Sequence, residues 1–508
     1  MIARSAVDRG GEPHPGLITF SVMLATVMQV LDTTIVNVSL PYMQGGLSAT
    51  QDQIDWVLTS YIVATAVATP LTGWMSGRLG RKRIFMWSVA IFTVTSLMCG
   101  VAPTLTDMVL FRILQGLAGA ALVPLSQAIL LDAYPREKHG SAMALWGVGI
   151  MIGPIMGPTL GGYLTEYANW RWVFFINLPV GLLAWTMIGA FVPETDRRRD
   201  IPFDMTGFAF LSLGISCLQL MLDRGQRLDW FSSHEIVIEA ALSVLGFYVF
   251  VVHVATTRHP FLNLRLLADR NYATSLIFIF IVGLILFASL ALMPPFMETL
   301  LDYPVLSTGL LLAPRGMGTM MSMLVVGRLM TLIDPRWIIL TGFMLTADSL
   351  WQMSGFSLNV GAWEIVQTGV VQGLGLGAIF VPLSAIAYAT LAPEHRNEAA
   401  SVFSLMRNIG SSVGISIMVA QLSRSMQINH AVIGEHINRF NPYFWRQDLP
   451  QLVDPLSHKG LALLNAEVGR QAGLIAYTND FVAMMVLALV AAPMVLVLKG
   501  TPKHAAAA

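Results

Sequence analysis

An aspartate stands in the middle of the first long apolar stretch, within Leu31-Asp32-Thr33-Thr34-Ile35-Val36-Asn37. Gln29 precedes Asp32 by three residues and Thr33 by four, and Thr33 precedes Asn37 by four, which predicts one polar helix face. A carboxylate at membrane depth is costly unless it faces a cavity or has a partner, so such residues usually mark ion or substrate pathways. The alternative is a structural stripe of hydrogen bonds between helices, and we favour the functional interpretation.

A cation lies about one turn into the fourth apolar stretch, which begins Asp107-Met108-Val109-Leu110-Phe111-Arg112 and continues to Gln115. An arginine there can snorkel to a membrane surface, or it can pair with Asp32. Burial favours a neutral acid and a nearby cation favours the ionised acid, so a movable pair could bind and release a proton. We therefore predict that Asp32 and Arg112 are proton-coupling groups, beside a polar lining of Gln29, Thr33, Asn37 and Gln115.

The fifth apolar stretch contains glycines at intervals of four, with two prolines and a further glycine. Small residues four apart let helices approach closely, and prolines bend a helix. Close packing alone is the alternative to a role in transport. The residues are Gly149, Gly153, Pro154, Gly157, Pro158, Gly161 and Gly162.

The loop after the second stretch reads Gly73-Trp74-Met75-Ser76-Gly77-Arg78-Leu79-Gly80-Arg81-Lys82-Arg83. Its glycines permit a tight turn, and its cations favour the cytoplasmic side of a membrane. Topology alone would explain these cations equally well. In the second half of the chain, Asp348 and Arg407 fall inside apolar stretches. They are candidates for secondary cavity charges, although charges in such places also pair structurally.

The composition indicates a membrane protein, because 55% of the 508 residues are hydrophobic and only 12% are charged. Soluble domains carry about 25% charged residues. The net charge is zero, which gives no indication of nucleic-acid binding, and Cys99 and Cys217 lie in separate apolar blocks without metal-ligand spacing. Hydrocarbon requires spanning segments of this kind to be helices. We predict about fourteen transmembrane helices, at 17–42, 54–75, 84–102, 107–131, 140–165, 171–192, 204–222, 236–256, 272–296, 306–327, 337–354, 362–391, 398–423 and 480–499.

Arginines and lysines gather in alternate short loops, which predicts a cytoplasmic N-terminus, an even number of spans and a cytoplasmic C-terminus. One long segment, 424–479, falls outside the membrane as a periplasmic loop. Its end, Leu461 to Tyr477, has apolar residues at near-helical spacing and predicts a short amphipathic helix.

The chain contains an internal repeat. Gln115-Gly116-Leu117 and Val123-Pro124-Leu125-Ser126 recur as Gln372-Gly373-Leu374 and Val381-Pro382-Leu383-Ser384. Parallel repeats of this kind are the layout of major-facilitator transporters, which handle substrate between the two halves. We predict an N-terminal six-helix half at 1–194, a linker with two extra spans at 195–265, and a C-terminal six-helix half at 266–508.

Together these motifs resemble the drug:proton antiporters of the major facilitator superfamily, and the span count resembles their fourteen-span, EmrB-type branch. In that family the aspartate matched by Asp32 and the arginine matched by Arg112 are linked to proton transfer. The stretch Gly153-Pro154 to Gly161-Gly162 resembles the antiporter motif, and Gly73, Arg78, Gly80 and Arg81 match the loop motif. The family usually has an acid where this chain has Gly77, so an acid-to-arginine latch at the loop is in doubt.

The resemblance implies proton-driven export of lipophilic compounds across a bacterial inner membrane by alternating access. It also implies a periplasmic membrane-fusion adaptor and an outer-membrane channel as partners, with no cofactor or metal. A proton-coupled exporter of one metabolite, such as a siderophore or a self-made antibiotic, fits the sequence as well. A membrane enzyme would need clustered nucleophiles or metal ligands at membrane depth, which the sequence lacks.

Overall fold

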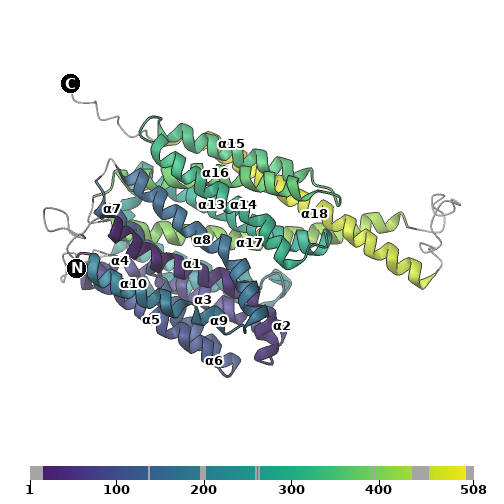
Figure 1. Ribbon diagram of the computed structural model, residues 1–508, viewed down its shortest axis with the longest axis horizontal. Helices are drawn as coiled ribbons and strands as arrows, with labels where there is room; N and C mark the ends of the chain where they lie inside the picture. Colours follow the sequence, from purple (N-terminus) through teal and green to yellow (C-terminus); the bar gives the residue numbers. More distant parts are fainter. Residues whose placement is uncertain are drawn as a thin grey trace.

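The computed structural model describes residues 15–498 apart from 136–137, 195–201, 258–259, 261, 263, 393–394 and 438–456. Throughout this part of the chain the regular structure is helical (Figure 1). Helical backbone satisfies its own donors and acceptors, as hydrocarbon requires. The predicted all-α class is confirmed.

The first half of the bundle and the linker follow the predicted order of spans. They comprise α1 (Pro15–Gly46), α2 (Gln51–Ile54), α3 (Trp56–Ala68), α4 (Leu71–Leu79), α5 (Arg81–Val101), α6 (Leu105–Gly119), α7 (Leu122–Ala133), α8 (His139–Tyr167), α9 (Trp172–Phe175), α10 (Asn177–Phe191), α11 (Met205–Arg224), η3 (Trp230–Ser232) and α12 (His234–Thr256).

The second half repeats this order with fewer breaks. It comprises η4 (Leu264–Ala268), α13 (Arg270–Pro295), η5 (Phe296–Leu300), α14 (Val305–Leu329), α15 (Pro335–Ser354), α16 (Ala362–Ala389), α17 (Arg396–Glu435), α18 (His458–Met494) and η9 (Val495–Val497).

Within the described residues, twelve helical segments are long and apolar enough to cross a membrane, and the bent pair α3 and α4 makes thirteen. The remaining predicted span, 337–354, corresponds to α15. This helix of 20 residues is about 30 Å long and packs against α16 and α18. It is less apolar than the others because it carries Arg336 and Asp348.

The second span is bent by 55° between α3 and α4. The bend falls at Thr69 and Pro70, because proline has no backbone N–H to donate and its ring clashes with the preceding turn. The bend turns α4 toward α17 of the other half.

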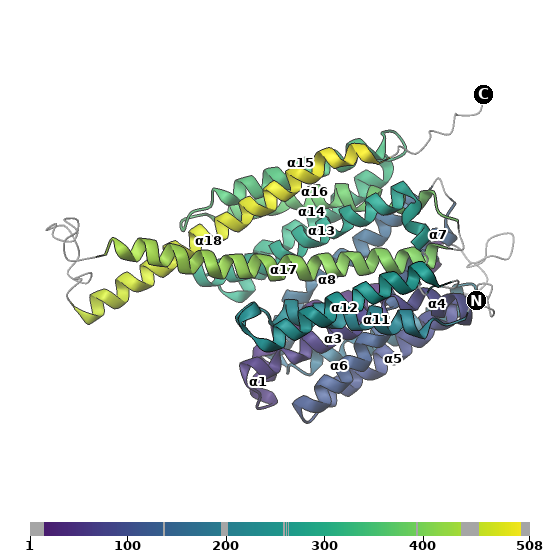
Figure 2. The same cartoon turned by 180° about the vertical axis from the view of Figure 1, so that it is seen from behind.

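The linker helices α11 and α12 pack on each other and join both halves at the side of the bundle (Figure 2). Asp223 accepts a hydrogen bond from Thr59 of α3, and Ser416 of α17 donates to the carbonyl of Leu222 at 2.7 Å. The predicted boundary near residue 195 lies outside the described residues.

The prediction of a long loop at 424–479 is wrong for the described part of that segment. α17 continues without a break to Glu435, and α18 begins at His458. The two helices leave the bundle together as an antiparallel pair, called here the hairpin (Figures 1 and 2). His430 lies 3.0 Å from the Asn465 side chain and so links the two helices. The predicted amphipathic helix at Leu461–Tyr477 is therefore the first part of α18, and 438–456 lies outside the described residues.

The two halves are joined by side chains at the end of the bundle opposite the hairpin. This end carries Arg81, Lys82 and Arg83 at the start of α5 and is called here the basic end. Thr72 and Ser401 are 2.7 Å apart, and Tyr388 donates to Gln127 at 3.2 Å. From this end the ribbons of the two halves diverge toward the hairpin end (Figure 1). This arrangement is typical of a carrier closed at one end of the bundle.

Candidate functional site

Asp32 lies at the centre of the first half, fully buried on α1. Its Oδ2 accepts from Arg112 Nη1 at 2.7 Å. Its Oδ1 accepts from Gln115 Nε2 at 3.0 Å and from Asn177 Nδ2 at 2.7 Å. A proton bound to either oxygen would compete with one of these donors, so the carboxylate is fully engaged in this conformation.

Arg112 is also fully buried, and the predicted pairing with Asp32 is confirmed. Its Nη1 donates to Gln115 Oε1 at 2.8 Å, and its Nε donates to the Val57 carbonyl at 3.0 Å. The guanidinium lies 4.2 Å from the centre of the Tyr61 ring, within cation–π range. Snorkelling to the surface is therefore wrong for this side chain. Asp32, Arg112, Gln115 and Asn177 are called here the charged node.

The predicted polar stripe on α1 is divided. Gln29 is buried and donates to the Tyr61 hydroxyl at 3.1 Å. Thr33 is half-buried and donates to the Val30 carbonyl of its own turn, while Asn37 is exposed. At about 100° per residue, Asn37 lies roughly 140° around the helix from Asp32. A single polar face over all four positions is therefore wrong.

Asn177 was missed by the sequence analysis. It opens α10 after the break at Ile176, and its amide contacts both Asp32 and the Ser96 hydroxyl, the latter at 2.9 Å. An amide inside the apolar sixth span was the available signal, since a buried amide needs partners. Because no other polar residue accompanies it at helical spacing on its own helix, the amide did not indicate which residue it would contact.

The glycines of α8 pack against α1. A Cβ on Gly153 would lie 2.6 Å from Val30 Cγ1, and one on Gly157 would lie 2.1 Å from Thr34 Oγ1. Thr34 Oγ1 is also 3.1 Å from the Gly153 carbonyl, to which it donates.

The predicted close packing is confirmed for these glycines, and it presses α8 onto the turns of α1 on either side of Asp32. Gly149 meets Met23 and Gly161 meets Ile35 in the same way, whereas a Cβ on Gly162 would meet nothing within 4 Å. Pro154 is half-buried, and the side chain of Pro158 lies outside the described ones.

The loop motif brings the halves together at the basic end. Gly73 lies against α17, because a Cβ there would be 3.0 Å from the Glu398 Cα. Gly80 has φ 96°, a backbone conformation that favours glycine, and it separates α4 from α5. Arg78 stacks over the Trp74 ring at 5.2 Å.

Arg81 pairs with Asp132 at the end of α7, and Arg396 at the start of α17 contacts the other oxygen of the same carboxylate at 2.9 Å. The sequence left a latch in doubt because Gly77 replaces the usual acid. Asp132 supplies a carboxylate from a different helix and links two arginines across the halves.

The two secondary charges lie away from the charged node. Asp348 is exposed on α15, where it accepts from Gln352 at 2.8 Å. Arg407 is half-buried on α17, with its backbone carbonyl against Gly283 of α13. Both belong to the second half, and neither contacts Asp32.

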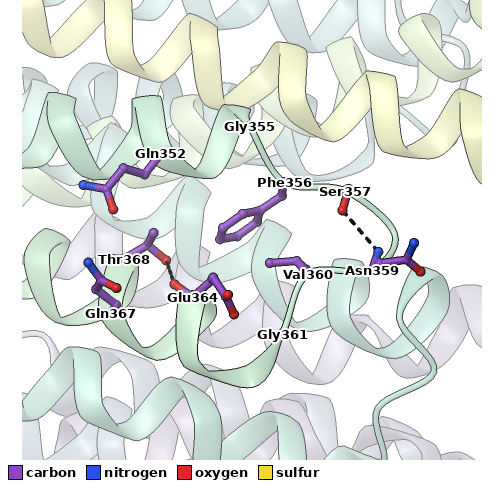
Figure 3. Close-up of a pocket in the computed structure, with 10 residues that line it drawn as sticks. All are labelled: Gln352, Gly355, Phe356, Ser357, Asn359, Val360, Gly361, Glu364, Gln367 and Thr368. Carbon is purple, nitrogen blue, oxygen red and sulfur yellow. Dashed lines mark hydrogen bonds between the residues drawn. The ribbon is translucent and has the colours of Figure 1, made fainter.

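A cavity of about 340 Å³ opens where α15 passes into α16, toward the hairpin end (Figure 3). Gln352, Asn359, Glu364 and Gln367 give it a polar lining, and Phe356 points into it. All of its lining comes from the second half. It therefore lies apart from the charged node and from the contact between the halves.

Comparison with known proteins identifies the family to which this architecture belongs. The Major Facilitator Superfamily profile matches residues 22–418. The multidrug export proteins EmrB of Haemophilus influenzae and of Escherichia coli K12 are each 35% identical to the chain, over 84% of both sequences. The fatty acid resistance protein FarB of Neisseria gonorrhoeae is 32% identical over 94% of this chain and 95% of its own length.

A solved structure agrees with the fold at low sequence identity. The human organic anion transporter MFSD10 superposes with a TM-score of 0.59 at 16% identity, covering 94% of this chain and 100% of that one. The profile, the relatives and the helical bundle agree. The chain therefore belongs to the EmrB-type branch of the major facilitator superfamily, as a multi-pass membrane transporter.

Proposed function

We propose that this protein exports lipophilic drugs or other toxic compounds across a bacterial inner membrane, in exchange for protons. The charged node is the observation that carries the proposal. An aspartate and an arginine, both fully buried and 2.7 Å apart, are expensive to keep within a membrane. A helix pair stabilised only by packing would not need them. The names of the relatives, which include multidrug export and fatty acid resistance, support lipophilic substrates.

Proton coupling requires that the environment of Asp32 change during transport. α1 carries Asp32 and packs on α8, and α8 packs on α14 of the other half. If the two halves rock against each other, the contacts that run from α14 through α8 to α1 are strained first. Separation of Arg112 from Asp32 would then free an oxygen for a proton, and renewed pairing would expel it.

The driving force is sufficient for efflux. One charge moved through 100 mV yields about 2.3 kcal/mol, so at an assumed ~150 mV one proton supports a gradient of roughly 300-fold. Among the described residues, the side-chain contacts that join the halves at the basic end support alternating access, with this end closed in the conformation described. The basic loops favour the cytoplasm for the closed end.

The test of export uses purified protein in liposomes, with a pH gradient imposed across the bilayer. A panel of lipophilic acids and lipophilic cations is offered, and uptake is followed with and without an uncoupler. We expect at least one compound to accumulate only while the gradient lasts. Accumulation of none, by protein that is folded and inserted, would refute proton-driven export. Accumulation of a single metabolite class would favour the dedicated exporter.

We further propose that the hairpin contacts a periplasmic adaptor. Two helices that project together from the bundle offer a contact surface outside the membrane, and relatives of the EmrB type are the reason to expect an adaptor there. A lid that folds onto the carrier itself is the alternative.

Because His430 and Asn465 lie side by side, residues 431–464 can be replaced by a short turn that leaves the base of the hairpin intact. This variant should transport normally in liposomes but lose drug resistance in whole cells. Resistance at the level of the unmodified protein would refute docking through the hairpin.

A further inference from the structure

A second carboxyl group is buried in the other half of the molecule. Asp480 of α18 is fully buried, and neither of its oxygens has a hydrogen-bond partner among the described residues. It differs in this from Asp32, which has three donors. Buried polar groups in folded proteins are nearly always satisfied, so an unsatisfied carboxyl group requires a reason.

The internal repeat gives this position a counterpart. α18 ends the second half as α10 ends the first. Asn177 lies 14 residues before Phe191, where α10 ends, and Asp480 lies 17 residues before Val497, where the span of α18 ends. Asn177 uses its amide to hold Asp32. At nearly the same depth the second half has an acid in place of the amide.

The surroundings of Asp480 are apolar and aromatic. Its neighbours on α18, Tyr477 and Phe481, pack against Phe296 of η5 with ring centres 5.2 and 6.2 Å away. Phe356, beyond α15, lies 6.5 Å from Phe481.

No ion pair of the described residues includes Asp480. Tyr477, three residues earlier on α18, is the nearest titratable side chain along its own helix. The helices packed on α18 are α13, η5, α15 and α17. Their titratable and charged side chains are Arg270 and Tyr272 of α13, Glu298 of η5, Arg336 and Asp348 of α15, and Arg396, Glu398, Arg407, Arg424, His430 and Glu435 of α17.

An ionised carboxylate that is fully buried and has no counter-ion among the described residues is costly, whereas the neutral acid is far less costly to bury. A proton on Asp480 also displaces no donor. We propose that Asp480 is a second proton-binding group of this carrier, and that it holds its proton in the conformation described here.

The proton comes from the hairpin end. The adjacent Asn479, on the hairpin side of Asp480 along α18, is exposed and donates to Ser425 of α17 at 3.3 Å. A carrier with two proton-binding groups, one in each half, can move more than one proton per cycle. That role in transport rests on the proposed function, whereas proton binding itself does not.

Proton binding is tested by infrared difference spectroscopy of the purified protein in lipid nanodiscs, recorded across a pH step. A protonated acid without hydrogen-bond partners gives a C=O stretching band at higher frequency than solvated acids do. We expect this band in the unmodified protein, its loss in Asp480→Asn, and its displacement in Asp480→Glu. Asp348→Asn is the matched control, because it removes an exposed acid from the neighbouring helix and should keep the band.

A band that persists in Asp480→Asn, or its absence from the unmodified protein at every pH, would overturn the proposal. The Glu variant gives the answer should the Asn variant prove unstable. A second measurement counts protons moved per substrate in liposomes, with the best-transported compound of the panel. A ratio lower by one in Asp480→Asn supports the coupling role, and an unchanged ratio removes it. Failure of all proton-driven export would refute the proposed function and leave the infrared test valid.

Discussion

The charged node makes a quantitative prediction about Asp32→Asn. The asparagine keeps one oxygen, which can still accept from Asn177 and Gln115. Its amide nitrogen then faces Arg112 Nη1, donor against donor. Arg112 remains fully buried with only neutral partners, the Val57 carbonyl and Gln115 Oε1. Breaking a buried ion pair by removing one partner costs about 3–5 kcal/mol.

The second substitution, Arg112→Met, removes the orphaned charge and keeps an apolar stem. In a double-mutant cycle we expect each single variant to lose about 3–5 kcal/mol of unfolding free energy. We expect the double variant to lose less than the sum of the two, by roughly 2 kcal/mol or more. The measurement is equilibrium unfolding of the purified protein by SDS in mixed micelles.

Transport provides the second measurement. Asp32→Asn and the double variant lack the carboxyl group that exchanges protons, and Arg112→Met lacks the cation that expels the proton from Asp32. All three variants should therefore bind substrate and exchange it down its gradient, but none should concentrate it. The roughly 300-fold ratio that one proton supports at an assumed ~150 mV would fall to about one. Asp32→Glu should keep part of the activity with a shifted pH optimum. Two results would refute this reasoning: additive stabilities within about 0.5 kcal/mol, or Asp32→Asn that pumps at the unmodified rate.

The other predictions concern packing, closure and topology. Gly157→Leu should abolish transport while the protein still inserts, because the leucine side chain would clash with α1. Gly162→Leu has open space around the new side chain and should transport normally. Equal transport by the two variants would show that the close contact between α8 and α1 is incidental. Asp132→Asn removes an ion pair between the halves that is partly exposed and contributes on the order of 1 kcal/mol. Spin labels on α7 and α17 should therefore report a several-fold larger population with the basic end open. Unchanged distances between the labels would mean that this ion pair does not keep the basic end closed. A reporter fused after Arg199 should be cytoplasmic and one fused within 440–455 periplasmic, and both on one side would contradict the fourteen-span arrangement.

The parts of this molecule set by local composition could be predicted from the sequence. Apolar blocks of about 20 residues mark spans because hydrocarbon thickness requires that length. Asp32 and Arg112 could be identified because charged residues are rare at membrane depth, and those of opposite charge tend to form ion pairs there. The spacing of the glycines in α8 predicted close packing of this helix against another.

The contacts between distant segments could not be predicted. Asp132 and Arg396 are 264 positions apart, and each has an ordinary explanation as a loop charge. Asn37 was misplaced because spacings of three and four residues accumulate rotation when they are chained along one helix. The hairpin was mistaken for a loop because polarity shows where a chain leaves the membrane, not where its helix ends.

The uninterrupted course of α17 has a mechanical consequence. Its 40 residues form a rod about 60 Å long at 1.5 Å per residue, twice the thickness of the hydrocarbon layer. One end is held at the contact between the halves, and the other, at Glu435 in the hairpin, is called here the tip of α17. A tilt of the second half about that contact moves the tip by about 1 Å per degree, given this length. The position of the hairpin outside the membrane therefore changes with the conformation of the carrier. By the reciprocity of coupled equilibria, a partner that restrains the tip also sets how readily the carrier turns over.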